Sequence, residues 1–446
     1  SLRRLENECL KAQLNDQSAL DFFDDRIFVN IHQFYGIEIN DFAATVAKTA
    51  LWIAESQMVN ETAKILARDI DFLPLKSYSN IIEGNALTLD WNTVCPASEL
   101  SYIMGNPPFV GYSLQSKQQK EELSNVCKEM GKNIDYVAAW YYKAAQLMQG
   151  TTIKAALVST NSITQGEQVA AIWKPLKELF DIEINFAYQT FRWDSEASLK
   201  AHVHCVIVSF SCFKENKSKH IYVSENRCQE GKHINGYLVD AEDVFIDGRK
   251  KPLCNIPEML KGSIPVDGGF LIIEARDYDD FIKQDPNSIQ FIRNIVGAEE
   301  FINNKKRYCL WLEHANPADI RKCPLVLERV KQVREMRLAS SKEATRKFAD
   351  YPMRFMEIRQ PDSDYILVPS HSSENRRYIP LGFMSPDVIS TNANLIIPNA
   401  TLYHFGILTS NVHMAWMRVV CGRLEMRYRY SNTIVYNNFP WPTITP

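Results

Sequence analysis

The sequence predicts an α/β protein whose first 235 residues form a doubly wound, mostly parallel sheet. Short apolar runs alternate with helical stretches over these residues, and this alternation is typical of parallel sheets with helices on both faces. After residue 235 the pattern changes to short segments separated by Asp, Gly and Pro, so a second domain is expected there. A length of 446 residues allows two to four domains of roughly 100–200 residues each.

Residue patterns give the expected elements in chain order. We expect strands at residues 34–39, 81–83, 102–104, 153–159, 182–188 and 202–210, with 81–83 and 102–104 buried. Helices are expected at 41–58, capped by Asp41, at 134–148 and at 167–179. Pro324 should open an amphipathic helix that reaches about residue 349, with Arg337 on its basic face. A β-rich stretch at 353–398 and an apolar helical stretch at 401–420 complete the expected elements.

Composition narrows the class of protein. No apolar run approaches the roughly 20 residues of a membrane helix. The ten cysteines form no C-x-x-C pair, which favours a reducing cytoplasm over a secreted disulfide framework. Histidines and cysteines at 202–212 fall on both faces of an expected strand, so we predict no metal site. Net charge is −3, but residues 301–380 carry 16 Lys and Arg against 10 Asp and Glu, which suggests a face for an anionic partner.

The segment that carries chemistry is a short apolar strand followed by Asn106-Pro107-Pro108-Phe109. Ligands of open α/β sheets bind just beyond the carboxyl ends of the strands. Proline lacks a backbone donor and has a fixed φ, so the turn is stiff and its carbonyls can accept hydrogen bonds. The Asn106 amide oxygen and a proline carbonyl could accept both hydrogens of an exocyclic amine, while Phe109 stacks. The alternative is a strand-ending turn that happens to contain two prolines.

This segment resembles motif IV of the amino-methylating DNA methyltransferases, (D/N/S)-P-P-(Y/F), and its Asn form is similar to the N6-adenine enzymes. The resemblance implies a Rossmann-like sheet that transfers a methyl group from S-adenosylmethionine (SAM) to N6 of an adenine flipped out of double-stranded DNA. It also implies that the catalytic residues are Asn106, Pro107, Pro108 and Phe109.

The same resemblance implies a set of cofactor and base contacts. Glu38 matches the acid of motif II, which binds the ribose hydroxyls of SAM, and Ile39 would pack on the cofactor adenine. Asn85 with Ala86 matches motif III, which reaches the adenine amine; the alternative is that Asn85 is a polar turn residue. Phe191, or alternatively Trp193, lies where motif VIII stacks on the flipped base. Weaker matches to motifs V and VI lie at Asp135-Tyr136 and Asn161-Ser162.

The later chain resembles the MmeI-like type II restriction–modification proteins of bacteria. This resemblance rests on the segments 355–361, 373–380, 403–408, 416–418 and 436–440. It implies a methyltransferase domain at 1–235, an α+β target-recognition domain at 236–385 and a C-terminal helical region at 386–446. The whole protein is expected to carry an N-terminal nuclease and a helical spacer, and to act in the cytoplasm.

One part of the family pattern has no match here. The glycine-rich motif I, which forms the central first strand of the sheet, is expected upstream of residue 1. Residues 1–446 alone are therefore predicted to bind SAM weakly or not at all and to transfer no methyl group.

Candidate DNA contacts lie in the basic part of the chain. Lys305, Lys306 and Arg307 are expected to contact phosphates. Base edges require paired donors and acceptors, and an acid alternating with a base on a β-like segment can supply both. That pattern selects Glu357, Arg359, Glu374 and Arg376, with surface ion pairs as the alternative.

Two rival functions remain open at this point. One is a DNA-binding specificity module without catalysis of its own. The other is an RNA or protein-glutamine methyltransferase, which also uses Asn-Pro-Pro turns but would not need the long C-terminal region.

Overall fold

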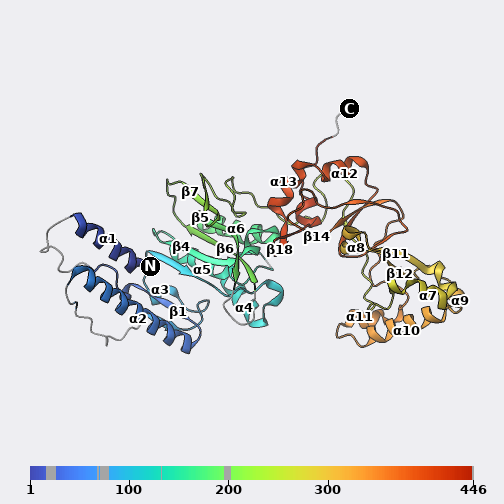
Figure 1. Ribbon diagram of the computed structural model, residues 1–446, viewed down its shortest axis with the longest axis horizontal. Coiled ribbons are helices and arrows are strands. Elements are labelled where there is room, and N and C mark those ends of the chain that lie inside the picture. The colour runs from blue at the N-terminus through green and yellow to red at the C-terminus, as the bar shows by residue number, and fades with distance from the viewer. Residues whose placement is uncertain (17–26, 68–69, 71–79, 132, 195–201, 444–446) are drawn as a thin grey trace. The chain divides into compact units, whose positions relative to one another are not determined.

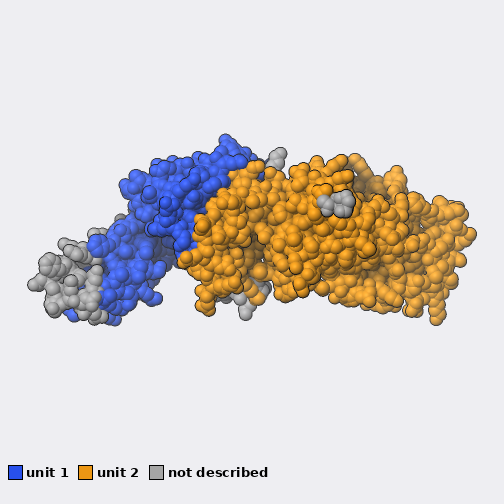
Figure 2. All heavy atoms as spheres, turned by 90° about the horizontal axis from the view of Figure 1, so that it is seen from above, with its two compact units in different colours: residues 1–159, 175–187, 207–220 blue, residues 160–174, 188–206, 221–446 orange. Residues whose placement is uncertain are grey.

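The computed structural model describes residues 1–16, 27–67, 70, 80–131, 133–194 and 202–443. The chain divides into two compact units, shown in different colours in Figure 2. Unit 1 comprises residues 1–159, 175–187 and 207–220, and unit 2 comprises 160–174, 188–206 and 221–446.

The first part of unit 1 combines two helices with a small parallel sheet (Figure 1). Strands β1 (Gly36–Glu38) and β2 (Ile81–Glu83) pair in parallel, with Gly36 opposite Ile81. The helices are α1 (Leu2–Asp16) and α2 (Asp41–Leu66). The expected cap of α2 was wrong, because the extended Asn40 accepts from the backbone nitrogen of Ala43 and Asp41 lies inside the first turn. The helix also continues past residue 58.

A six-stranded sheet with the order β3-β4-β6-β5-β7-β8 follows. Strands β3 (Tyr102–Gly105) and β4 (Lys154–Thr160) pair in parallel, and every second residue of β4 is buried. The expectation that β3 is buried was wrong, because Tyr102 and Met104 are 66% and 74% exposed. Among the described residues, β3 pairs with β4 alone, so its side chains lack a second neighbouring strand to pack beside.

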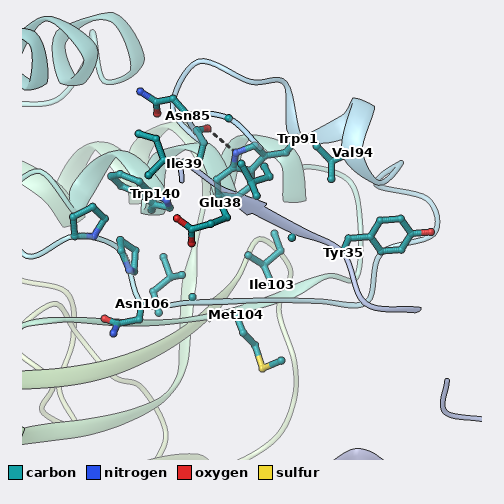
Figure 3. Close-up of a pocket in the computed structure, with 18 of the residues that line it drawn as sticks. Tyr35, Glu38, Ile39, Asn85, Trp91, Val94, Ile103, Met104, Asn106 and Trp140 are labelled. Atoms are coloured by element: carbon teal, nitrogen blue, oxygen red, sulfur yellow. Dashed lines mark hydrogen bonds between the residues drawn. The ribbon is translucent and has the colours of Figure 1, made fainter. Parts of the chain in front are cut away.

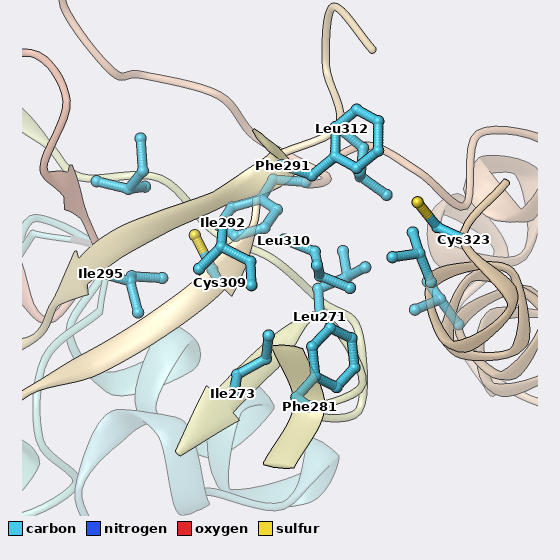
Figure 4. Packing of buried hydrophobic residues seen from close by; sticks show 14 of the residues in the cluster. Leu271, Ile273, Phe281, Phe291, Ile292, Ile295, Cys309, Leu310, Leu312 and Cys323 are labelled. Carbon is cyan, nitrogen blue, oxygen red and sulfur yellow. The ribbon is translucent and has the colours of Figure 1, made fainter. Parts of the chain in front are cut away.

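The described residues of unit 2 form three further sheets, with the orders β10-β12-β11-β16, β15-β13-β17-β9 and β14-β19-β18. The first of these sheets contributes to an apolar core, shown in Figure 4. Leu271 and Ile273 pack there with Phe281, Cys309 and Leu310, and Phe355 joins the same core from a later loop.

The expected long basic helix is interrupted. Helix α10 (Pro324–Leu338) ends before Ser340, whose hydroxyl accepts from the backbone nitrogen of Lys342, and α11 (Glu343–Lys347) follows. Serine side chains compete with helical hydrogen bonds in this way. Placing Arg337 on the basic face was also wrong, because its side chain is fully buried. Its guanidinium donates to five backbone carbonyls, those of Pro265, Val266, Phe348, Tyr351 and Arg354.

The remaining helices and strands complete the order along the chain. The helices are α3 (Trp91–Val94), α4 (Lys117–Val126), α5 (Ala138–Met148), α6 (Gly166–Phe180), α7 (Tyr278–Gln284), α8 (Ala298–Asn303), α9 (Pro317–Ile320), α12 (Leu402–Leu408) and α13 (Asn411–Val420). The strands are β5 (Glu183–Asp194), β6 (His202–Ser211), β7 (Lys219–Ser224), β8 (Arg227–Gly231), β9 (Leu260–Lys261), β10 (Ile272–Glu274), β11 (Ile292–Val296), β12 (Arg307–Leu310), β13 (Tyr365–Pro369), β14 (His371–Ser372), β15 (Gly382–Met384), β16 (Ile389–Ser390), β17 (Asn394–Pro398), β18 (Gly422–Leu424) and β19 (Arg427–Arg429). Within the ranges described, no helix is long and apolar enough to span a membrane. Nor do three His, Cys, Asp or Glu side chains gather there as metal ligands would.

Candidate active site

The Asn-Pro-Pro turn begins where β3 ends. Pro107 is buried, whereas Asn106 and Pro108 are exposed. The Pro108 carbonyl accepts from the backbone nitrogen of Val110 at 3.2 Å. The Asn106 side chain and the Pro107 carbonyl make no hydrogen bond to any described residue, so these two acceptors remain available to a ligand.

A second loop holds this turn in place. The Val110 carbonyl accepts from the backbone nitrogen of Tyr136 at 3.0 Å. The Asp135 carboxylate accepts from the backbone nitrogen of Tyr112 at 3.1 Å, and the buried Gln115 amide donates to the Ile134 carbonyl at 2.9 Å. These bonds tie the segment after the prolines to residues 134–136, and the turn is therefore held on its C-terminal side.

Glu38 and Ile39 lie where β1 passes into α2. The Glu38 carbonyl accepts from the backbone nitrogen of Gly84 at 2.8 Å, which joins β1 to the turn after β2. One Glu38 carboxylate oxygen accepts from the backbone nitrogen of Asn40 at 3.3 Å and leaves the other facing the cavity. Ile39 is 69% exposed, so an apolar side chain is presented beside that carboxylate.

Both ends of the Asn85 amide are already hydrogen-bonded. Its oxygen accepts from the backbone nitrogen of Leu87 at 2.9 Å, and its nitrogen donates to the Glu122 carboxylate at 3.0 Å. The Ala86 carbonyl next to it accepts from the Trp91 indole at 2.8 Å. A ligand can therefore use the second lone pair of the Asn85 oxygen and the second hydrogen of its nitrogen.

Glu122 on α4 is a residue that the sequence analysis missed. Besides Asn85, its carboxylate accepts from the Gln118 amide at 2.9 Å and from the Tyr136 hydroxyl. Burial and the adjacent Glu122 carboxylate raise the pKa of Tyr136 well above its usual value, so the phenol stays protonated and donates. Glu122 thus connects the turn after β2, helix α4 and the 134–136 loop. A four-residue spacing from Gln118 is its only sequence signal.

These elements enclose a cavity of about 880 Å³ (Figure 3). Its lining includes seven of the eight residues predicted for catalysis and cofactor binding, namely Glu38, Ile39, Asn85, Ala86, Asn106, Pro107 and Pro108. Phe109, the eighth, is half-buried and is not among the lining residues. Glu122, Tyr136 and Trp140 also line the cavity, and the last two pack edge to face at 5.3 Å.

Phe191 and Trp193 lie on β5. Their ring centroids are 6.3 Å apart, Phe191 is half-buried, and Trp193 is 44% exposed. Both residues belong to unit 2, whereas the cavity belongs to unit 1. Stacking on a flipped base by either ring stays a prediction.

The first group of DNA-contact candidates is partly engaged in ion pairs. Lys305 pairs with Glu299, and Arg307 contacts Glu274 at 3.1 Å and Glu300 at 3.3 Å. Lys306 is exposed and has no carboxylate partner in the described part of the chain. Phosphate contacts by Lys305 and Arg307 would have to compete with these carboxylates.

The second group forms two different structures. Glu357 and Arg359 form an ion pair with each other, and the backbone of Glu357 bridges to Ile264. Glu374 and Arg376 were expected on a β-like segment, and this was wrong because they lie in a turn after β14. The Ser373 hydroxyl accepts from the backbone nitrogen of Asn375 at 3.2 Å and favours that turn. Arg376 is exposed there, while Glu374 is half-buried.

Comparison with known proteins identifies the family. A family model described as the MmeI DNA-methyltransferase domain matches residues 1–223, and one described as the MmeI target recognition domain matches residues 240–443. DNA methyltransferase A of Bacillus subtilis (strain 168) is 40% identical over 422 residues, or 94% of this chain and 48% of that protein.

A solved structure agrees with these matches. The type IIL restriction–modification enzyme MmeI in complex with DNA aligns with a TM-score of 0.90 and 45% identity, covering 100% of this chain and 60% of that one. The chain spans about half the length of the curated relative. The predicted family and fold class are confirmed: the chain belongs to the MmeI-like type II restriction–modification enzymes, of which it carries the DNA-methyltransferase and target recognition domains.

Proposed function

We propose that this chain is the part of a site-specific DNA methyltransferase that methylates N6 of a flipped adenine and recognises the target sequence. One observation carries the proposal: the two free acceptors of the Asn106-Pro107 turn and the Glu38 carboxylate belong to the same cavity. A methyltransferase of this class needs an amine-binding turn and a cofactor-binding acid within one cleft.

The chemistry follows from the two acceptors. The Asn106 side-chain oxygen and the Pro107 carbonyl accept the two hydrogens of the adenine N6 amine, which turns the nitrogen lone pair away from the turn. Bound SAM supplies an electrophilic methyl group on a sulfonium. When N6 bonded to that carbon, the carbon–sulfur bond would break, the sulfur would leave as a neutral thioether, and the proton lost from N6 would pass to solvent. Because attack precedes proton loss, no strong base is required in the site.

The residues present fit the adenosine half of SAM. The free Glu38 carboxylate oxygen suits the ribose hydroxyls, and the exposed Ile39 suits one face of the adenine. Asn85 and Ala86 border the same space. The cavity of about 880 Å³ lies within the usual range for small-molecule sites, about 300–1,000 Å³.

The proposal extends to the DNA. Phe109 and Phe191, or Trp193 in its place, would stack on the flipped base. Lys305, Lys306 and Arg307 would contact phosphates, and Glu357, Arg359, Glu374 and Arg376 would contact base edges. The DNA complex of MmeI, at 45% identity, supports double-stranded DNA as the partner. In the whole protein a nuclease and a helical spacer would precede these domains.

Transfer of labelled methyl groups from SAM to duplex DNA by the full-length protein tests the proposal. Asn106→Ala should lower kcat by at least about 100-fold, as loss of one positioned polar group does in other enzymes, and should leave SAM binding unchanged. Asn125→Ala, on the exposed face of α4, is the control and should retain full activity. Equal activity of the Asn106 variant and the wild type would refute the assigned role.

A DNA-binding specificity module without catalysis is the second candidate. One observation favours it. Among the described strands, none pairs with both β1 and β3, so no strand closes the cavity between these two. The test compares residues 1–446 with the full-length protein in DNA binding and in methyl transfer. If residues 1–446 bind the target duplex without transferring a methyl group, and the full-length protein does transfer one, this part of the chain acts as a specificity module.

A further inference from the structure

The end of the chain concentrates arginine. Residues 370–446 contain six arginines, no lysine and three carboxylate side chains. The arginines fall into two segments, 376–377 and 418–429. Hydrogen bonds join these segments, because the Arg418 guanidinium donates to the Arg377 carbonyl at 2.8 Å and the Arg423 guanidinium donates to the Arg418 carbonyl at 3.2 Å. The arginines therefore form one cluster in the fold.

Strands β18 and β19 form a two-faced hairpin at the centre of this cluster, residues 422–429, which we call the arginine hairpin. Tyr428 and the adjoining Tyr430 are buried, and the Tyr430 hydroxyl bonds to the His413 ring at 2.9 Å. Arg427 and Arg429 alternate with these tyrosines along the chain and are exposed. One face is therefore anchored in the core, and the other carries the guanidinium groups.

The positive charge on this face is only partly balanced. Arg427 pairs with Glu425 at 3.0 Å, and both side chains are more than half exposed. Arg429 has no carboxylate within 4.0 Å among the residues that the structure describes. His371 lies opposite Arg429 on the neighbouring strand. Its pKa is lowered first by burial and then by the positive charges of Arg429 and Arg427.

The hairpin contacts residues 161–166, which follow β4 in the chain and belong to unit 2 as the hairpin does. The Asn161 amide, one residue beyond β4, donates to the Glu425 carbonyl at 3.4 Å. Gly166 approaches Gly422 so closely that an added Cβ would lie 3.4 Å from the Gly422 backbone.

We propose that the arginine hairpin binds the sugar-phosphate backbone of the duplex DNA on which the chain acts, through Arg427 and Arg429. This inference rests on the proposed function, because it takes DNA as the partner. Guanidinium groups bind phosphate oxygens bidentately, and such contacts add affinity without reading sequence. The hairpin therefore positions the duplex and leaves base recognition to other residues.

The test is equilibrium DNA binding by the full-length protein across a series of salt concentrations. The double substitution Arg427→Gln with Arg429→Gln should reduce the slope of log K against log salt by about 1.8, since each phosphate contact contributes about 0.9. Extrapolated from 1 M, that slope corresponds to roughly a 60-fold loss of affinity at 0.1 M salt. Target and scrambled duplexes should lose equally, and the KM for DNA should rise at constant kcat.

Matched variants separate the possible outcomes. Lysine at both positions keeps the charge and should retain most of the slope, whereas Arg276→Gln with Arg321→Gln, on exposed arginines outside the cluster, should change nothing. An unchanged slope for the glutamine variant, or a loss confined to the target sequence, would overturn the inference. If the wild type binds and methylates DNA while the glutamine variant matches it, only this inference fails; a wild type that binds no DNA refutes the proposed function as well.

Discussion

A substitution of Arg337 should strongly destabilise the recognition domain. The buried Arg337 guanidinium donates to carbonyls from two chain segments, Pro265 with Val266 and residues 348–354. The Phe348 ring also covers it, with 5.0 Å between the guanidinium carbon and the ring centroid. Arg337→Met keeps a similar chain length but removes every donor. We expect this variant to loosen both segments.

The magnitude follows from the hydrogen bonds. Four of them are between 2.7 and 3.0 Å long, and the fifth, to Phe348, is 3.4 Å. A hydrogen bond to a charged group contributes about 1.5–3 kcal/mol, and a buried carbonyl left unpaired costs about 1–3 kcal/mol. Removing the guanidinium also removes its own burial penalty, so the net loss in the free energy of unfolding is about 3–5 kcal/mol.

Hydrogen exchange and urea unfolding measure this effect. Exchange should accelerate at the amides of Val266, Tyr351, Met353 and Arg354 in Arg337→Met and stay unchanged at β4. Arg337→Lys offers three donors from one nitrogen and should lose less, about 2 kcal/mol. Arg334→Met on the exposed face of α10 is the control and should stay within about 0.5 kcal/mol of the wild type. An Arg337→Met protein as stable as this control would refute the reasoning.

Three further predictions concern the cavity, acid stability and base recognition. Glu122→Gln should weaken SAM binding by about tenfold, roughly 1.4 kcal/mol, because glutamine keeps only one acceptor oxygen and leaves either the Asn85 amide or the Tyr136 hydroxyl without its partner. Calorimetry on the full-length protein checks this, and Glu121→Gln, whose side chain is 64% exposed, is the control. Burial lowers the pKa of His413 to about 4, so the unfolded chain binds the proton first as pH falls below about 6.5. Stability should therefore fall by about 3 kcal/mol between pH 6.5 and pH 4, and His413→Phe should remove that part of the pH dependence of urea unfolding. Arg359→Ala should relax one position of the recognised site by about 1–3 kcal/mol; mapping of methylated sites checks it, and a uniform loss over all sequences would instead indicate a phosphate contact.

Local chemistry explains what the sequence predicted well. The parallel strands at 36–38, 81–83 and 102–105 and the turn at Asn106 arise from short apolar runs and from proline, whose signals lie within a few residues of one another. The motif residues follow the ends of β1, β2 and β3 and line one cavity, although β1 and β2 form one sheet and β3 belongs to another.

Side chains that act over long sequence separations could not be predicted in this way. Glu122 contacts Asn85 from 37 residues away, and Arg337 reaches carbonyls up to 72 residues away. Helical periodicity assigned Arg337 to a solvated face, because an arginine is seldom buried without a carboxylate. Five backbone carbonyls from two other chain segments are its partners instead. No residue pattern along α10 indicates the positions of these carbonyls.

The Glu357–Arg359 ion pair changes how base recognition by these residues should work. In the chain without DNA, each side chain already satisfies the other, so a base contact must replace that pair. An exposed ion pair contributes about 0–1 kcal/mol, whereas a good bidentate base contact discriminates by about 1–3 kcal/mol. Contact with a matched base pair offsets the loss of the ion pair, and contact with a mismatched base pair does not. The Glu357–Arg359 ion pair therefore increases discrimination more than affinity. Glu357→Ala should therefore free Arg359 to bind phosphates, which raises affinity for a scrambled duplex while discrimination falls. Equal losses on target and scrambled DNA would contradict this exchange.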